Sequence, residues 1–242
     1  MSVTLGFPEP KTQRESTRSS RHTVEAARGE ISDSAVRFLW EHAFRDLTVN
    51  ELMAGTTLSR PAFYQYFSDL HELMESLLGQ VESVMRATAN PWIMGEGEPI
   101  AALRASLGGV IQTSVDHGPV LRAVAEAAPL DARLEAAWSA FMGRWNDAVC
   151  TRIEAQQQAG LIPEFDARRM ANALNALDAA VLIAEFGRQP QGDPDAVLDT
   201  LHAIWVGVLY GSVPKRLPVS EVAQDMSTAD STPLSTRGDP TR

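Results

Sequence analysis

The sequence predicts an all-α protein, and three features of its 242 residues carry that prediction. Apolar residues recur at intervals of three and four through the middle of the chain, which places them on one face of a helix. Alternating runs of β-branched residues, which would indicate strands, are missing from the sequence. Hydrophobic residues make up 44% of the chain, which is enough to build a substantial core between helices.

The two ends of the chain lack this periodicity. Residues 1–28 are rich in Ser, Thr and Arg, and residues 212–242 are rich in Ser, Thr and Pro. We therefore predict a disordered basic arm at the first segment and a disordered tail at the second. Between them, short helices give way to long ones near residue 69, so we expect a small domain over 29–68 and a larger domain over 69–211.

The small domain is expected to hold three helices. The first covers roughly 29–43. Thr48 and Glu51 have the spacing of a capping box, which starts the second helix. Ser59 is a suitable N-cap for a short third helix over 60–67.

The third helix has two different faces. Phe63 and Phe67 are four residues apart and should point inward, while Arg60 and Tyr64 share another face. Two short helices across a tight turn, with Arg, hydroxyl and amide groups outward, are typical of a helix-turn-helix. A plain packing helix in a bundle fits the same residues, so the pattern alone leaves both readings open. For a DNA-binding face, the expected contact residues are Thr48, Ser59, Arg60, Pro61, Ala62, Tyr64, Gln65 and Tyr66.

The larger domain is expected to be a helical bundle. Asp69 and Glu72 repeat the capping pattern and start a helix that should run to Asn90, before a loop over 91–99. Glycines and prolines then divide the remaining sequence into helices at about 100–116, 119–128, 131–159, 166–187 and 194–210.

Charge is distributed unevenly. The net charge is −10, which argues against a general binder of polyanions. Residues 1–68 nevertheless carry eight Lys/Arg and eight Asp/Glu, so the acidic excess belongs entirely to the rest of the chain. A local DNA-binding surface in the first part is therefore compatible with the composition.

Several other classes of protein are disfavoured. The only cysteine, Cys150, cannot form an intramolecular disulfide, which fits a reducing compartment. No apolar run has the length of a signal peptide or a membrane span, so we expect a cytoplasmic protein with no membrane partner. The five histidines are scattered, and no metal-ligand spacing or glycine-rich phosphate loop occurs. We therefore expect no enzyme, no metal and no cofactor.

Residues 47–78, LTVNELMAGTTLSRPAFYQYFSDLHELMESLL, resemble the DNA-binding domain of the TetR family of repressors, in particular its EthR-like branch. The similarity continues in WSAFMGRW at 138–145, ALNALD at 173–178 and VLDTLHAIWVGVLYG at 197–211. The resemblance implies a homodimer, paired through its last two helices, that binds double-stranded DNA at a palindromic operator. It further implies release from DNA when a hydrophobic or amphipathic small molecule fills the C-terminal domain.

The same resemblance implies a long apolar ligand pocket. The matching positions are Leu103, Val110, Ser114, Trp138, Met142, Trp145, Asn175, Asp178, Ile183, Phe186 and Trp205. The Trp-rich stripe is also compatible with ordinary core packing, because its members recur at helical spacing. EthR-like relatives tend to have an amide at the position of Asp178. At the other end of the pocket they have larger aromatic residues at the positions of Leu103, Val110 and Ser114. Both departures imply a different ligand.

Two further departures concern DNA binding. Thr57 stands where the family usually has a glycine in the turn, and Leu70 stands where it commonly has a lysine that contacts phosphate. We expect weaker DNA binding from these changes unless the arginines of the basic arm compensate. An alternative function is therefore a helical ligand-binding or interaction protein whose DNA binding is weakened or lost.

Overall fold

The structure is a computed structural model that describes residues 13–211, with side chains described from Val24 onward. This part of the chain is helical without strands, which confirms the predicted fold class. The α-helices are α1 (Gln13–Glu41), α2 (Val49–Ala54), α3 (Arg60–Tyr66), α4 (Leu70–Met94), α5 (Pro99–Ala127), α6 (Ala132–Gln158), α7 (Ala167–Phe186) and α8 (Pro194–Leu209). Short 3₁₀ helices occupy Phe44–Asp46 and Ala128–Leu130.

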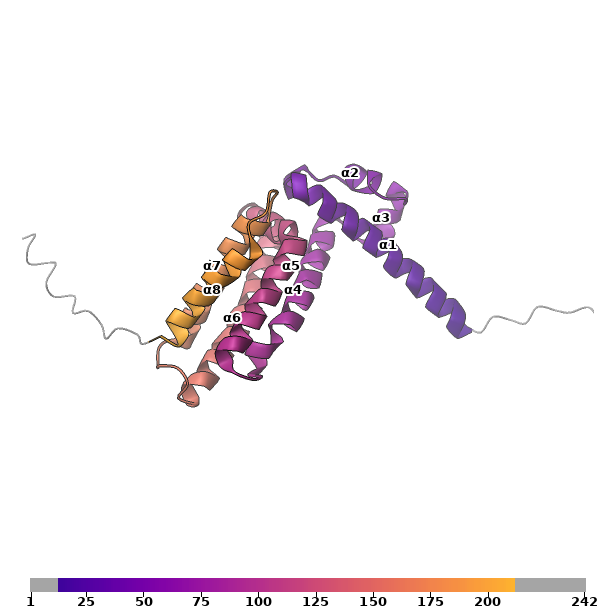
Figure 1. The fold of residues 1–242 in the computed structure, drawn as a ribbon. Helices are drawn as coiled ribbons and strands as arrows, with labels where there is room; N and C mark the ends of the chain where they lie inside the picture. Colours follow the sequence, from indigo (N-terminus) through magenta and orange to yellow (C-terminus); the bar gives the residue numbers. More distant parts are fainter. Residues whose placement is uncertain (1–12, 212–242) are drawn as a thin grey trace, which may run out of the picture.

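The helices form two groups (Figure 1). Helices α4 to α8 make an elongated bundle in which α4 packs on α5 and α6 packs on α7. Helix α1 carries α2 and α3 at one end of this bundle, and its N-terminal part extends away from it. No helix in the described residues combines the length and apolar character needed to cross a membrane.

The basic arm is shorter than predicted. Residues 1–12 and 212–242 lie outside the described residues, but α1 already begins at Gln13, so a disordered arm reaching residue 28 is wrong. Ala27 is buried and Arg28 donates a hydrogen bond to the carbonyl of Tyr66, so the end of the supposed arm is packed against α3. Once this part is helical, extending the helix toward the N-terminus costs little, because each added residue gains a hydrogen bond.

Helix α4 also continues past its predicted end. The expected loop over 91–99 is helical up to Met94, and Gly95, with a φ of 78°, terminates the helix. The ring of Trp92 is buried, and its backbone N–H donates to the hydroxyl of Ser106 at 3.0 Å. This tertiary contact holds the last turn in place although Pro91 cannot donate a backbone hydrogen bond.

Helix α5 is continuous where a break was predicted between residues 116 and 119. Pro119 lacks the N–H that would bond to the carbonyl of Val115, but the side-chain amide of Gln191 donates to that carbonyl at 2.9 Å. Gly118 does not end the helix. It lies so close to the carbonyl of Phe186, at the end of α7, that a Cβ atom would not fit there.

Arg122 joins the two groups of helices. The residue is 1% exposed, and its guanidinium donates to the carbonyls of Leu39 and His42, the latter at 3.1 Å. These carbonyls belong to the C-terminal end of α1, where a positive charge interacts favourably with the helix dipole. A common core, which includes Leu39 and Phe63 from the small domain and Val124 from α5, continues across the junction.

Candidate DNA-binding face and ligand cavity

Helix α3 is held by its inward face. Phe63 and Phe67 are almost completely buried, and Leu58 packs against the same core, so the predicted division of this helix is confirmed. Ser59 is at the N-cap position, although its side chain makes no capping hydrogen bond. At the other end, Arg28 lies 4.2 Å above the ring of Phe67 and bonds to the last carbonyl of the helix.

Most of the predicted contact residues are on the outer surface of α3. Tyr64 is 56% exposed, and its hydroxyl forms no hydrogen bond with any described residue. Four other predicted contact residues are also exposed, namely Ser59, Arg60, Pro61 and Gln65. Ala62 is half-buried.

Two predicted contact residues have other partners. Tyr66 is half-buried and packs against the core. The Thr48 hydroxyl accepts from the N–H of Glu51 and donates to its carboxylate at 2.8 Å, in a complete capping box. These contacts give both residues a structural role in addition to any contact with DNA.

The turn before α3 accommodates Thr57 without a left-handed backbone. No residue other than glycine has a positive φ in the described chain. Instead, the backbone N–H and the hydroxyl of Thr57 both donate to the carboxylate of Glu30 on α1. These hydrogen bonds lower the pKa of Glu30 below its usual value, and they fix the turn to α1.

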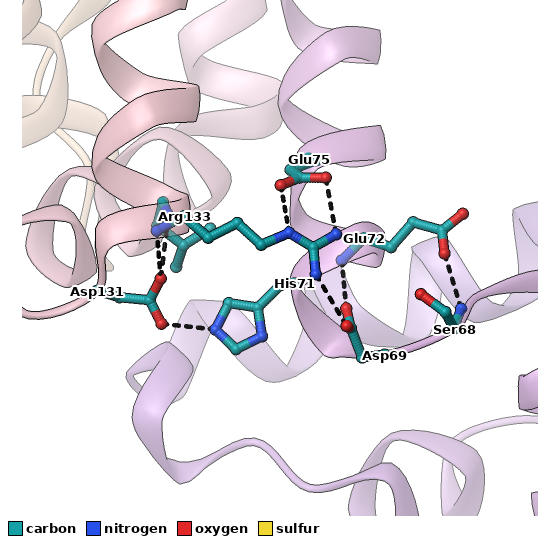
Figure 2. A network of polar contacts seen from close by, with 8 residues as sticks. Ser68, Asp69, His71, Glu72, Glu75, Asp131 and Arg133 are labelled. Carbon is teal, nitrogen blue, oxygen red and sulfur yellow. Dashed lines mark hydrogen bonds and ion pairs between the residues drawn. The ribbon is translucent and has the colours of Figure 1, made fainter.

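Polar contacts connect the N-terminal ends of α4 and α6 (Figure 2). Arg133 of α6 bonds to both oxygens of Glu75, at 2.6 and 3.0 Å, and to Asp69, the N-cap of α4, at 2.8 Å. His71 lies 2.6 Å from Asp131, the N-cap of α6. We call these five residues the α4–α6 junction. Because α4 follows α3 directly, the junction fixes the position of α3 relative to α6.

A cavity lies in the interior of the bundle between α4, α5, α6, α7 and α8. Together with its opening to solvent the cavity has a volume of about 720 Å³, of which about 80 Å³ is accessible to water. Its walls are mostly apolar and aromatic, which is typical of sites for small organic molecules. The space for water-sized molecules is narrow, so a larger ligand has to push the helices apart or displace side chains.

The structure brings nine of the eleven predicted pocket residues together around this cavity. These nine are Leu103, Val110, Trp138, Met142, Trp145, Asn175, Asp178, Ile183 and Trp205. Ser114 and Phe186 are not among its lining residues, and both are fully buried. Ser114 donates to the carbonyl of Val110 within α5, and Phe186 packs in the core at the end of α7, so the structure does not bring these two residues to the cavity.

Sequence reasoning missed the contribution of α4 to the cavity. Met85, Ala89, Trp92 and Ile93 line it from that helix. The spacing of three and four between these residues was a usable sign, but the predicted break at Pro91 separated Trp92 from the helix. Further lining residues are Ser106, Leu107, Leu121, Phe141, Val149, Ala179 and Leu182.

The polar groups of the cavity are concentrated on α7. The indole N–H of Trp205 donates to Oδ1 of Asp178 at 3.1 Å, and the side-chain amide of Asn175 donates to Asn146 at 2.9 Å. Burial raises the pKa of Asp178 to about 7, and the Trp205 hydrogen bond opposes this only partly. A carboxyl with such a pKa exchanges its proton near neutral pH.

Helices α7 and α8 lie on the side of the bundle away from the free end of α1 (Figure 1), and small residues are exposed on both helices. Ala173, Ala180 and Ala184 are exposed on α7, as are Ala203 and Gly207 on α8. Leu201 and Leu209 of α8 are completely buried in the chain's own core.

Comparison with known proteins agrees with this arrangement. Residues 103–211 match the family described as the C-terminal domain of the transcriptional regulator EthR. The HTH-type transcriptional regulator EthR of Mycobacterium tuberculosis is 30% identical over 188 residues, which cover 75% of this chain and 86% of that protein.

Solved structures share the fold at lower identity. The TetR family transcriptional regulator PfmR from Thermus thermophilus has a TM-score of 0.61 at 17% identity, covering 72% of this chain and 95% of its own. AibR, solved with isovaleryl coenzyme A and operator DNA, has a TM-score of 0.59 at 17% identity, covering 76% of this chain and 98% of its own. EthR and PfmR are named as transcriptional regulators rather than enzymes. The chain belongs to the EthR-like branch of the TetR family of transcriptional regulators.

Proposed function

We propose that the chain is a homodimeric transcriptional repressor of the cytoplasm, which binds a palindromic operator and leaves it when a hydrophobic or amphipathic molecule fills the bundle cavity. The observation that carries this proposal is the combination of an exposed α3 face and an apolar cavity in one chain of this family. Residues 29–68 would form the DNA-binding domain, and residues 69–211 the ligand-binding and dimerisation domain. Helix α1 would extend the first of these toward the N-terminus.

The DNA-binding part of the proposal is supported by the surface of α3. Arg60 and Gln65 are exposed and have the donor geometry that matches purine edges in the major groove. Tyr64 offers a free hydroxyl for a phosphate. Leu70 packs partly against the core and His71 is bonded to Asp131, so the start of α4 supplies no lysine-like phosphate contact, and we expect moderate affinity.

The switching part is supported by the position of the cavity. Helices α4 and α6 both line it, and their N-terminal ends are joined at the α4–α6 junction next to α3. A ligand that separates the cavity walls therefore acts on two helices whose N-terminal ends hold α3 in place. Such a ligand shifts the protein toward the non-binding state by its difference in affinity for the two states.

The dimer is supported by the exposed small residues of α7 and α8, since small side chains permit close approach of helices from two copies. A twofold dimer through this face would present two α3 helices to half-sites about one DNA turn, roughly 34–36 Å, apart.

A reporter assay tests the function as a whole. The DNA upstream of the chain's own gene is placed before a reporter, and the full chain is expressed beside it. We expect reporter output to fall with the wild-type chain and to recover with Arg60→Ala, while Arg104→Ala, which removes a surface arginine of α5, still represses. Unchanged output with a well-expressed wild-type chain would contradict repression at this site, and increased output would identify an activator.

A further inference from the structure

The cavity contains one group that can carry charge. Among the side chains that line it from α4, α5, α6, α7 and α8, Asp178 alone is titratable, and the surrounding groups are apolar or neutral. No cation from the described elements therefore balances an ionised Asp178. An isolated carboxylate in such surroundings is unfavourable until something pairs with it.

Asp178 has capacity for a ligand. The Trp205 indole occupies Oδ1, and Oδ2 receives no hydrogen bond from any described residue. Asn175, one turn earlier on α7, also lines the cavity. Its amide nitrogen is used by Asn146, which leaves its carbonyl oxygen without a donor among the described residues. The polar end of the cavity thus offers two free acceptors.

Free acceptors select a ligand that donates hydrogen bonds. Alcohols and amides can donate, but only a cation also neutralises the carboxylate, whereas an anionic head group would be repelled by it. The rest of the cavity is lined by apolar and aromatic side chains, which favour an apolar body.

We propose that the effector is an amphiphilic amine, with its apolar body in the bundle cavity and its protonated amino group against Oδ2 of Asp178 and the carbonyl oxygen of Asn175. This inference rests on the proposed function, because it names the class of molecule that the switching cavity takes.

Binding of the amine should depend on pH. The pKa of Asp178 is raised to about 7, so the carboxyl is mostly neutral at pH 6 and mostly ionised at pH 8. An alkylamine stays protonated across this range, and it binds the ionised carboxylate. Amine affinity should therefore rise about tenfold from pH 6 to pH 8, and a neutral ligand should show no such rise.

Calorimetric titration of the full chain with decylamine, decan-1-ol and decanoate tests the inference, since these probes share one alkyl chain. Decylamine should bind the wild type about 10- to 100-fold more tightly than it binds Asp178→Asn, as expected when a charge-assisted hydrogen bond is lost. The affinities of decan-1-ol for the two proteins should agree within about threefold. Decanoate should bind the wild type more weakly than the other two probes do. Asp116→Asn, which removes an exposed carboxyl of α5, should behave as the wild type does.

The inference is overturned if decylamine binds Asp178→Asn as tightly as the wild type, or if decan-1-ol binds the wild type as tightly as decylamine. Retained binding of decan-1-ol shows that the variant's cavity is intact. If the variant does not fold, the pH series and the comparison of amine with alcohol on the wild type decide alone. DNA retardation is measured separately: retardation without amine binding defeats this inference only, whereas amine binding by a dimer that retards no upstream DNA defeats the proposed repressor.

Discussion

Arg60 is the residue on which the proposed reading of DNA depends most. It is exposed at the first position of α3 and belongs to a helix whose opposite face is fixed by Phe63. Replacing it by Ala should weaken binding to upstream palindromic DNA by about 1–3 kcal/mol, because one base or phosphate contact per half-site is lost. Fluorescence anisotropy measures this, with Arg104→Ala as a charge-matched control that should bind normally.

Tyr64→Phe complements that change. It keeps the ring that packs edge-on against Phe63 and removes only the exposed hydroxyl. Weaker binding with an unchanged melting temperature would assign the hydroxyl to the DNA contact. If both Arg60→Ala and Tyr64→Phe bind as the wild type does, the outer face of α3 is not the docking surface.

The raised pKa of Asp178 predicts that the stability of the protein depends on pH. Its folded-state pKa of about 7 exceeds the ordinary value of 3.8, so the folded ligand-free protein holds a proton that the unfolded chain releases at lower pH. The contribution of this group to stability is therefore fully present below pH 3.8 and is lost as pH rises toward and through 7.

Asp178→Asn should remove this loss. Between pH 5 and pH 8, the wild type should lose on the order of 2 kcal/mol of unfolding free energy relative to the variant. Urea titrations of both proteins at the two pH values measure the difference. A difference that stays constant with pH would show that the carboxyl is not perturbed.

The inward and outward residues of α3 could be predicted from the sequence more reliably than the residues that line the cavity. The inward and outward positions of α3 follow from the phase of a short helix, so Phe63 and Tyr64 could be assigned from the sequence. Ser114 and Phe186 were assigned to the cavity by resemblance, but the structure buries them elsewhere. Their surroundings depend on how α5 meets the end of α7, a long-range contact that no local pattern contains.

At the scale of elements, the α4–α6 junction is expected to hold the first turns of α4. Arg133→Gln removes the ion pairs to Glu75 and Asp69, all of which are partly exposed. The global unfolding free energy should change little, as is usual for surface ion pairs. Amide hydrogen exchange over residues 70–78 should nevertheless become faster, because the N-cap and the second turn lose their common anchor.

Arg168→Gln is the control for this experiment. Arg168 also forms an exposed ion pair between helices, with Asp147 at 2.6 Å, but far from the start of α4. Its replacement should leave exchange over residues 70–78 unchanged. Equal exchange in the wild type and Arg133→Gln would show that the junction does not restrain α4.

Helix starts that a capping residue marks were predicted better than helix ends. Capping residues such as Thr48 and Asp69 act locally, and both accept the expected backbone hydrogen bond. The helix end before Pro91 and the helix break before Pro119 were predicted wrongly, because partners distant in the sequence compensate for proline. Ser106 bonds to the N–H of the residue after Pro91, and Gln191 bonds to the carbonyl that Pro119 leaves free.

At the scale of the whole molecule, the outer face of α7 and α8 should be the dimer contact. Gly207 is exposed on α8, and a Cβ atom placed there meets no atom of its own chain within 4 Å. Gly207→Arg should therefore leave the protomer folded but block the close approach of a second copy. Light scattering should then find a monomer, and operator binding should fall because two half-sites are no longer bound together.

Gly79→Arg provides a matched control on α4. This glycine is also exposed within a helix, and a Cβ atom there also meets nothing within 4 Å. The control should remain a dimer. If Gly207→Arg remains a dimer as well, the subunits associate through another surface.

The central claim is that this acidic chain is a dimeric DNA-binding regulator, and one measurement tests it most directly. The wild-type dimer is titrated onto a labelled duplex from the region upstream of its gene, at several salt concentrations, and its retardation in a gel is recorded. The account predicts binding that saturates at one or more whole dimers per palindrome and weakens steeply as salt increases, since phosphate contacts release counterions. A folded dimer that retards no upstream duplex, even at low salt, would contradict it.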